Sequence, residues 1–197
     1  MKNALLLTSL FGAALSITAC SNPMKDPAAS HAMASHDQVV APKLTDGSIQ
    51  VPADYRSWPE YVTGIDKQET GQIRDIYINP TGYQAKAGED FADGSFSVME
   101  IWKAKKAADG MLMTTDDGKL VKDELSLVFL MAKSPGAGSL VDPALRTGDW
   151  IYAGYAADGK TPAGPPAAAC RSCHLQVADA DWVFRYDEYF ANRAAGQ

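Results

Sequence analysis

Alternating apolar and polar side chains predict strands in the middle of the chain. The segments with this period of two are residues 73–79, 96–103, 125–133 and 149–156. In the first segment, Arg74, Ile76 and Ile78 share one face, because successive side chains of a strand point to opposite faces of a sheet. Since the segments follow one another through turns such as Asp93-Gly94, we expect an antiparallel sheet of four to five strands.

Longer spacings predict helices beside this sheet. Tyr55, Trp58 and Tyr61 recur at helical intervals where the domain begins, and residues 177–191 have the pattern of a terminal amphipathic helix. A short helix is also expected over residues 81–87. The fold class predicted is therefore α+β, with helices flanking an antiparallel sheet.

The N-terminus has the pattern of a bacterial lipoprotein signal peptide over residues 1–19. Lys2 precedes an apolar stretch, residues 4–17, that is too short to span a membrane. The sequence Ile17-Thr18-Ala19-Cys20 resembles the box in which lipid is added to the cysteine and cleavage occurs before it. An ordinary signal peptide is the alternative, but Cys20 then has no partner. Ser21 favours the outer membrane, so we expect a periplasmic domain anchored by lipid.

Residues 20–50 predict a lipidated cysteine followed by a flexible tether. The stretch after Cys20 is rich in Ser, Ala, Pro and Asp and has little periodicity. His31 and His36 lie in it and are interpreted as solvated tether residues rather than metal ligands. The folded domain is then expected over residues 51–197.

Composition narrows the classes of partner. The chain has 197 residues, of which 46% are hydrophobic, so a packed domain is expected rather than disorder. Its net charge of −6 predicts no nucleic-acid partner, because nucleic-acid binding needs a basic surface. Two of its three cysteines share one short motif, and Cys20 is the third.

That motif is Cys170-Arg171-Ser172-Cys173-His174, the C-x-x-C-H signature of covalent haem attachment. Two thiols one helical turn apart can add to the two vinyl groups of one porphyrin. The next residue, His174, then supplies the proximal ligand of the iron. We expect one covalent haem c, held by thioethers to Cys170 and Cys173.

The two cysteines of the motif have three other interpretations. A disulfide between Cys170 and Cys173 is open to an exported protein. A redox dithiol would need a βαβ context, and none precedes the motif. A zinc site would need a further Cys or His pair, which the folded domain lacks. The full five-residue signature favours haem over all three.

The order of several further motifs resembles the cytochrome P-460 family and its relative, cytochrome c-prime-beta. These motifs are Tyr55-Arg56-x-Trp58, Ile73-Arg74-x-Ile76-Tyr77-x-Asn79-Pro80, Phe91-x-Asp93-Gly94, the C-x-x-C-H at 170–174 and Asp181-x-Val183-Phe184. The resemblance implies a mostly antiparallel sheet that holds one haem c on a C-terminal helix. It also implies hydroxylamine oxidation in some members, a redox partner cytochrome and, by analogy, a homodimer.

The chain departs from the oxidising members at two positions. Where they carry a lysine cross-linked to the haem edge, this sequence has Met99. Lys103 is on the same strand face but about 13 Å further along, too far to replace it. A distal carboxylate of those members aligns near Phe129. Both departures favour an apolar distal wall, which resembles that of the gas-binding relatives.

Two functions follow from these features. The first is an open distal site, shaped by Met99 and Phe129, that binds NO or oxidises small nitrogen compounds such as hydroxylamine as a haem oxidoreductase. Arg74 is the one cation expected to face it, with a bound ligand, a haem propionate or a surface carboxylate as its partner. The second is a six-coordinate His/Met electron carrier. Its candidate methionine ligands are Met99, Met111, Met113 and Met131. A bond between Met99 and the porphyrin is a third outcome.

Overall fold

The computed structural model describes residues 43–196, and one antiparallel sheet forms its centre. Its five strands lie in sequence order and are β1 (Glu60–Lys67), β2 (Gln72–Ile78), β3 (Phe96–Ala104), β4 (Lys122–Lys133) and β5 (Trp150–Ala156). Each strand pairs with its neighbour in the chain. The antiparallel α+β fold predicted from the alternation is confirmed.

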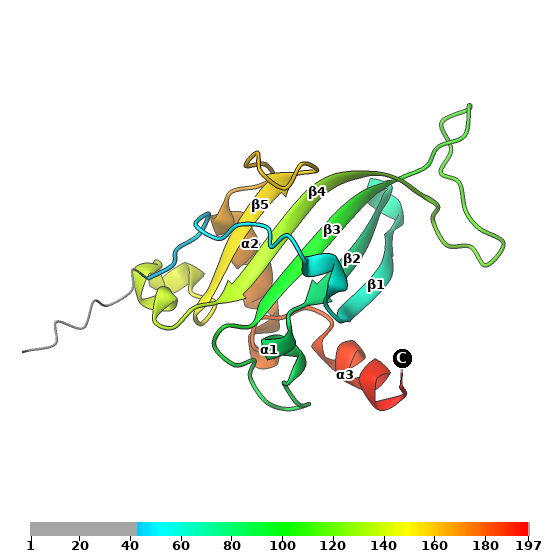
Figure 1. Ribbon diagram of the computed structural model, residues 1–197. Coiled ribbons are helices and arrows are strands. Elements are labelled where there is room, and N and C mark those ends of the chain that lie inside the picture. Colours follow the sequence, from blue (N-terminus) through cyan, green and yellow to red (C-terminus); the bar gives the residue numbers. More distant parts are fainter. Residues whose placement is uncertain (1–42, 197) are drawn as a thin grey trace, which may run out of the picture. The chain divides into compact units, whose positions relative to one another are not determined.

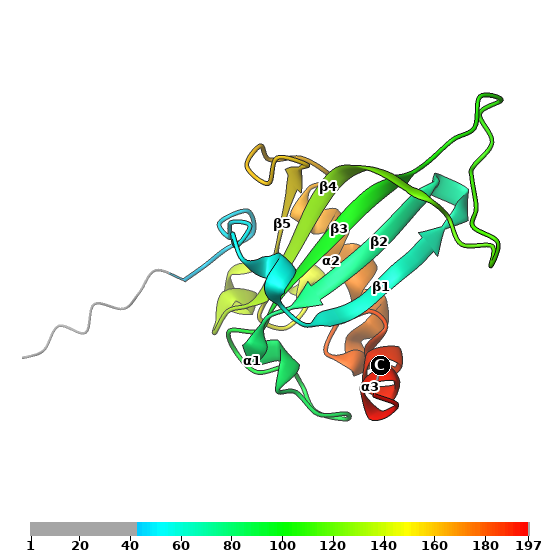
Figure 2. The same cartoon turned by 45° about the vertical axis from the view of Figure 1, so that its right-hand side comes forward.

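Helices lie on one face and at one end of the sheet (Figure 1). They are α1 (Pro80–Tyr83), α2 (Ala167–His174) and α3 (Tyr186–Ala194), with short 3-10 turns between other elements. Figures 1 and 2 show α2 and α3 on one side of the sheet, while the segment that precedes β1 crosses the other side. There, Ile49 and Tyr55 are buried against β-strand residues such as Val98 and Val128.

The first predicted helix is wrong. Only a 3-10 turn, Tyr55–Ser57, forms there, and the chain continues as the edge strand β1. Two register shifts in the pairing with β2 interrupt the alternation of β1, and the backbone N–H of Gly64 donates to the Asp75 carboxylate at 2.9 Å. A bulged strand does not show a clean period of two, so its pattern resembled a helix.

The predicted terminal helix is broken into two parts. Leu175–Ala180 forms 3-10 turns, and α3 begins only at Tyr186. Between them, Asp181, Trp182 and Arg185 have φ angles of 50°, 55° and 59°. These left-handed conformations end any helix, and non-glycine residues rarely adopt them. The short helix expected over 81–87 is a single turn instead, Pro80–Tyr83.

The end of the segment that the sequence assigns to a tether packs on the domain. Ile49 is buried, and the carboxylate of Asp46 pairs with Arg171 of α2. The described residues before position 51 are therefore part of the folded unit. The signal peptide, Cys20, His31 and His36 lie outside the described residues.

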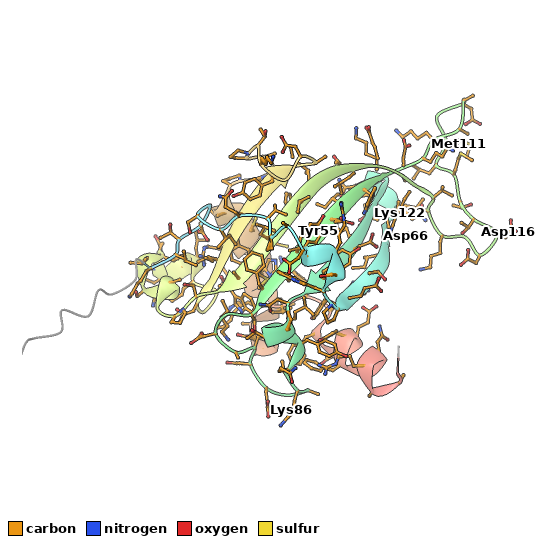
Figure 3. The ribbon with its side chains drawn as sticks, in the orientation of Figure 1. Tyr55, Asp66, Lys86, Met111, Asp116 and Lys122 are labelled. Carbon is orange, nitrogen blue, oxygen red and sulfur yellow. The ribbon has the colours of Figure 1, made fainter. Side chains whose placement is uncertain are left out.

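Residues 105–121, between β3 and β4, extend beyond the end of the sheet (Figure 3). Met111 and Met113 lie on this extension and are exposed. Among residues 43–196, none of the helices has the length and apolar character needed to cross a membrane.

Candidate functional site

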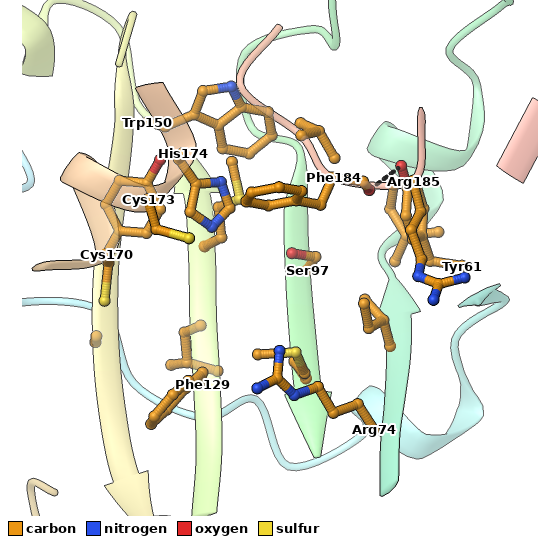
Figure 4. A pocket seen from close by; sticks show the side chains of 18 of the residues that line it. Tyr61, Arg74, Ser97, Phe129, Trp150, Cys170, Cys173, His174, Phe184 and Arg185 are labelled. Atoms are coloured by element: carbon orange, nitrogen blue, oxygen red, sulfur yellow. Dashed lines mark hydrogen bonds between the residues drawn. The ribbon is translucent and has the colours of Figure 1, made fainter. Parts of the chain in front are cut away.

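A cavity of about 490 Å³ lies between the sheet and α2 (Figure 4). Its sheet wall includes Arg74 of β2, Met99 of β3 and Phe129 of β4. Met99 is paired in register with Phe129, so their side chains leave the same face of the sheet. The structure thus brings together, on one cavity, residues that are up to 100 positions apart, since Cys170, Cys173 and His174 line it as well.

The two cysteines lie three residues apart on α2, so both side chains fall on one helix face. Their thiols are free and not joined to each other. Burial raises the pKa of the Cys170 thiol, with the Asp46 carboxylate acting in the same direction. Because both thiols line the cavity from one helix face, they are placed to react with one group there.

His174 is fixed through one ring nitrogen. Its Nδ1 lies 2.6 Å from the carbonyl oxygen of Trp182. A carbonyl oxygen only accepts, so Nδ1 carries the proton and Nε2 is left with its lone pair. Burial lowers the pKa of His174, although the bond to Trp182 opposes this. The neutral tautomer that results is the form in which histidine ligates a metal.

Aromatic rings hold the imidazole from two sides. The ring centroids of Phe184 and Tyr152 lie 5.0 Å and 5.1 Å from that of His174. The Phe184 contact is edge-on, an arrangement that aromatic pairs prefer. The ligand ring is therefore oriented by packing as well as by its hydrogen bond.

Arg74 and Phe129 lie together at the end of the cavity away from His174 (Figure 4). The Nε of Arg74 is buried and has no hydrogen-bond partner within residues 43–196. No carboxylate of that range forms an ion pair with it, so a surface ion pair does not explain its place. A buried donor without a partner is costly, which indicates that something bound in the cavity accepts from it.

Arg74 is not the one cation at the cavity, contrary to the sequence-based expectation. Lys67 of β1 and Arg185 also line it. No strand was predicted over the residues of β1, so Lys67 was not expected at the cavity. Figure 4 shows Arg185 beside Tyr61, on the side opposite Cys170 and Cys173. The cavity therefore has thiols at one side and a cation at the other.

Two glycines make room for the ring of Phe129. A Cβ at Gly154 of β5 would lie 3.1 Å from the ring and 2.4 Å from the carbonyl oxygen of Ala163. A Cβ at Gly164 would lie 2.5 Å from the ring, and its φ of +90° also requires glycine. The loop between β5 and α2 thus closes directly behind Phe129.

Arg171, one of the two variable positions of the C-x-x-C-H motif, is fully buried. It forms two hydrogen bonds to the Asp46 carboxylate, both at 2.9 Å, and one to the Thr147 hydroxyl at 3.0 Å. It also donates to the Trp150 carbonyl. These contacts fix α2 against β5 and against the segment before β1. The C-x-x-C-H signature does not predict this role, because it leaves the identity of its two middle residues open.

The candidate methionine ligands divide into two pairs. Met99 and Met131 line the cavity, whereas Met111 and Met113 lie on the exposed extension between β3 and β4. Lys103, the alternative cross-linking residue, is exposed and its Nζ pairs with Glu124 at 2.5 Å. Lys103 is absent from the cavity wall.

The donor set fits a haem. The cavity volume falls in the range of cofactor sites, about 300–1,000 Å³. Two free thiols, one neutral imidazole nitrogen and one unpaired guanidinium nitrogen converge on it. Within the described part of the chain, no three His, Cys, Asp or Glu side chains gather as they would around a metal ion.

Comparison with known families gives a match over most of the folded part of the chain. The family model described as Cytochrome P460 matches residues 52–185, which include the sheet, the motif and the loop after it. A search of curated proteins finds no match.

Proposed function

The chain belongs to the cytochrome P460 family and is a haem protein of that type, and on this premise we propose that it carries one covalent haem c. Cys170 and Cys173 would form the thioethers, and Nε2 of His174 would ligate the iron. Support comes from the free thiols and from the imidazole whose other nitrogen is already engaged. We further propose that the open end of the cavity binds NO or a small nitrogen compound such as hydroxylamine.

The haem would supply an iron that binds such a ligand and exchanges electrons with a redox partner. The apolar side chains of Met99 and Phe129 exclude water and favour a neutral ligand, because an unpaired anion is costly in apolar surroundings. Arg74 can donate a hydrogen bond from its free Nε to the bound molecule or to a haem carboxylate. This combination suits diatomic binding and leaves oxidation of hydroxylamine as an activity to be measured.

One observation carries the proposal: the thiols, the ligating histidine and an apolar wall line the same cavity. The test is the optical and electron-spin spectrum of the purified full-length protein, ferric and ferrous, with and without NO and hydroxylamine. We expect a high-spin ferric spectrum that changes with NO, and a haem stain that survives a denaturing gel. Replacing Cys170 and Cys173 by Ser should abolish that stain. A colourless wild-type protein would refute the proposal.

The place of Arg74 is tested separately. Arg74→Gln should weaken the binding of NO to the ferric protein by roughly 10-fold. That factor corresponds to the loss of one charge-assisted hydrogen bond. Arg56→Gln is the matched control, because Arg56 pairs with Glu100 on the other face of the sheet. A change in the haem carboxylate vibrations without a change in affinity would instead assign Arg74 to a propionate.

The second candidate function is a six-coordinate His/Met electron carrier, because Met99 and Met131 line the cavity. It predicts a low-spin ferric spectrum with a Met–iron charge-transfer band. Met99→Ala or Met131→Ala should then remove the band, while Met113→Ala, on the exposed extension, should keep it. Intact-protein mass after removal of iron tests a bond between Met99 and the porphyrin.

We also propose that the domain is a periplasmic lipoprotein, anchored through Cys20 to the outer membrane. Its expected partners are a redox cytochrome and, by family analogy, a second copy of the chain. Cys20→Ser should move the protein from the membrane fraction to the soluble periplasmic fraction. Unchanged sedimentation with membranes would contradict the lipid anchor.

A further inference from the structure

A buried carboxylate holds the loop that follows the haem-binding motif. The Asp181 side chain is 1% exposed and accepts from Lys133 Nζ at 2.9 Å and 3.0 Å and from the backbone N–H of Phe91 at 2.9 Å. The Asp181 carbonyl accepts from the indole N–H of Trp150 at 2.8 Å. This one residue therefore ties the loop to β4, to β5 and to the segment before β3.

The next residue gives its carbonyl to the histidine. Trp182 accepts from His174 Nδ1 at 2.6 Å, in a backbone conformation that is left-handed at both Asp181 and Trp182. Such a conformation is unfavourable for a non-glycine residue and persists only where its surroundings impose it. The contacts of Asp181 with Lys133, Phe91 and Trp150 impose this conformation directly beside the Trp182 carbonyl.

The remaining groups of the loop leave it little freedom. The Trp182 ring packs on Gly148, where a Cβ would lie 2.6 Å from Cζ3. Two residues further on, the Phe184 carbonyl accepts from the Tyr61 hydroxyl at 3.1 Å. The distance between His174 and the Trp182 carbonyl is thus fixed by contacts from both sides of the loop.

We propose that Asp181 is a positioning residue for the proximal histidine. Through its ion pair with Lys133, it holds the Trp182 carbonyl against Nδ1 of His174 and thereby sets how strongly Nε2 donates to iron. The reason is general: an acceptor on the far nitrogen of a ligating histidine fixes its tautomer and raises its basicity. The inference rests on the proposed haem function, and it gives the acidic residue of the Asp181-x-Val183-Phe184 motif a physical role.

The experiment compares Asp181→Asn with Asp149→Asn in the full-length, haem-loaded protein. Asp149 is the control, because its carboxylate accepts from backbone N–H groups as that of Asp181 does, here from Gly136 and Gly138 at 2.8 Å and 2.9 Å. Among residues 43–196, neither of these hydrogen bonds of the Asp149 carboxylate involves the loop after the motif. The readouts are the iron–histidine stretching frequency of the ferrous protein and the reduction potential.

We expect Asp181→Asn to lower the iron–histidine stretching frequency and to raise the reduction potential, because Nε2 donates less strongly to iron. The affinity of His174 for the iron should fall by roughly 10–100-fold. Asp149→Asn should leave all three at their wild-type values. If Asp181→Asn does not fold, Lys133→Gln removes the charge partner of the Asp181 carboxylate instead and should shift the frequency in the same direction. Equal frequencies in the wild type, the folded Asp181 variant and the control would overturn the proposal and leave the haem function standing.

Absence of haem would instead refute the proposed function, and the positioning role can then be tested without it. The Nδ1 proton of His174 should resonate far downfield in the wild type and in Asp149→Asn, as a short hydrogen bond requires. Asp181→Asn should shift it upfield. An unchanged resonance there would overturn the positioning role independently.

Discussion

At the scale of single residues, the apolar distal wall depends on the absence of side chains at two glycines as much as on the ring of Phe129. Phe129 can cover the cavity floor because Gly154 and Gly164 have no side chain behind its ring. Phe129 and Met131 are two residues apart on β4 and so share a strand face, and both line the cavity. The sequence could not predict the glycine contacts, since they depend on how the loop after β5 folds back.

Gly164→Ala should therefore move Phe129 and change ligand binding. Overpacking of this kind costs roughly 1–3 kcal/mol, in addition to the strain of alanine at a φ of +90°. Gly159→Ala is the matched control: its φ is +66°, but its Cβ would lie at an ordinary 3.6 Å from Val51. We expect both variants to lower the urea midpoint, and Gly164→Ala alone to change the rate of CO rebinding after flash photolysis. Equal rebinding rates would show that the ring does not shape the ligand path.

The burial of Arg171 could not be predicted from the residues around it. The C-x-x-C-H spacing identified Cys170, Cys173 and His174, and the structure places all three on one cavity. Arg171, which lies between the two cysteines, is the most buried cationic residue among residues 43–196, and no local pattern indicated this. A buried guanidinium needs partners from distant segments, here Asp46 and Thr147, and sequence spacing contains no record of them.

At the scale of elements, regular alternation predicted four of the five strands, β2 to β5, with ends within a few residues of those observed. The errors lie where the backbone is irregular. β1 carries two register shifts, and the terminal helix is interrupted by left-handed residues that are not glycine. The bulge in β1 has one local signal, Gly64 with a φ of 63°, because a glycine inside a strand often marks a bulge. The break in the terminal helix has none, because tertiary contacts such as the Lys133–Asp181 pair impose it.

The turn after β5 should loosen in acid. Hydrogen bonds from the side chain and backbone of Thr161 and from the backbone of Lys160 lower the pKa of Asp158 from 3.8 to about 2. Because the folded-state pKa is depressed, the contribution to stability is complete above 3.8 and is lost as the pH falls through about 2. Amide exchange of Lys160 and Thr161, measured across this range, should lose protection toward the acid end.

Asp158→Asn provides the control for that titration. The asparagine oxygen can still accept from the two backbone N–H groups, but it has no proton to gain in this range. Protection of the two amides should be lower than in the wild type near neutral pH and independent of pH in acid. A wild-type profile that is equally flat would contradict the assignment to Asp158.

At the scale of the whole described molecule, the segment before β1 connects one face of the sheet to the motif helix on the other. Ile49 is buried on the face opposite the cavity, while Asp46 reaches Arg171 of α2. Asp46 also accepts from the backbone N–H of Tyr152 at 3.0 Å. The sequence predicted a domain that begins near residue 51, because a polar stretch with one aspartate and one isoleucine has no periodicity to detect.

A chain that begins at residue 51 should consequently be much less stable than one that begins at residue 43. Removing Asp46 leaves the Arg171 side chain, which is 2% exposed, without its charge partner, and breaking a buried pair costs on the order of 3 kcal/mol. Asp46→Asn in the longer chain isolates this part, since it keeps Ile49 in place. Urea midpoints of the three haem-loaded proteins should fall in the order longer chain, Asp46→Asn, shorter chain. Equal midpoints for the two chain lengths would show that the segment is dispensable and that the domain begins where the sequence pattern placed it.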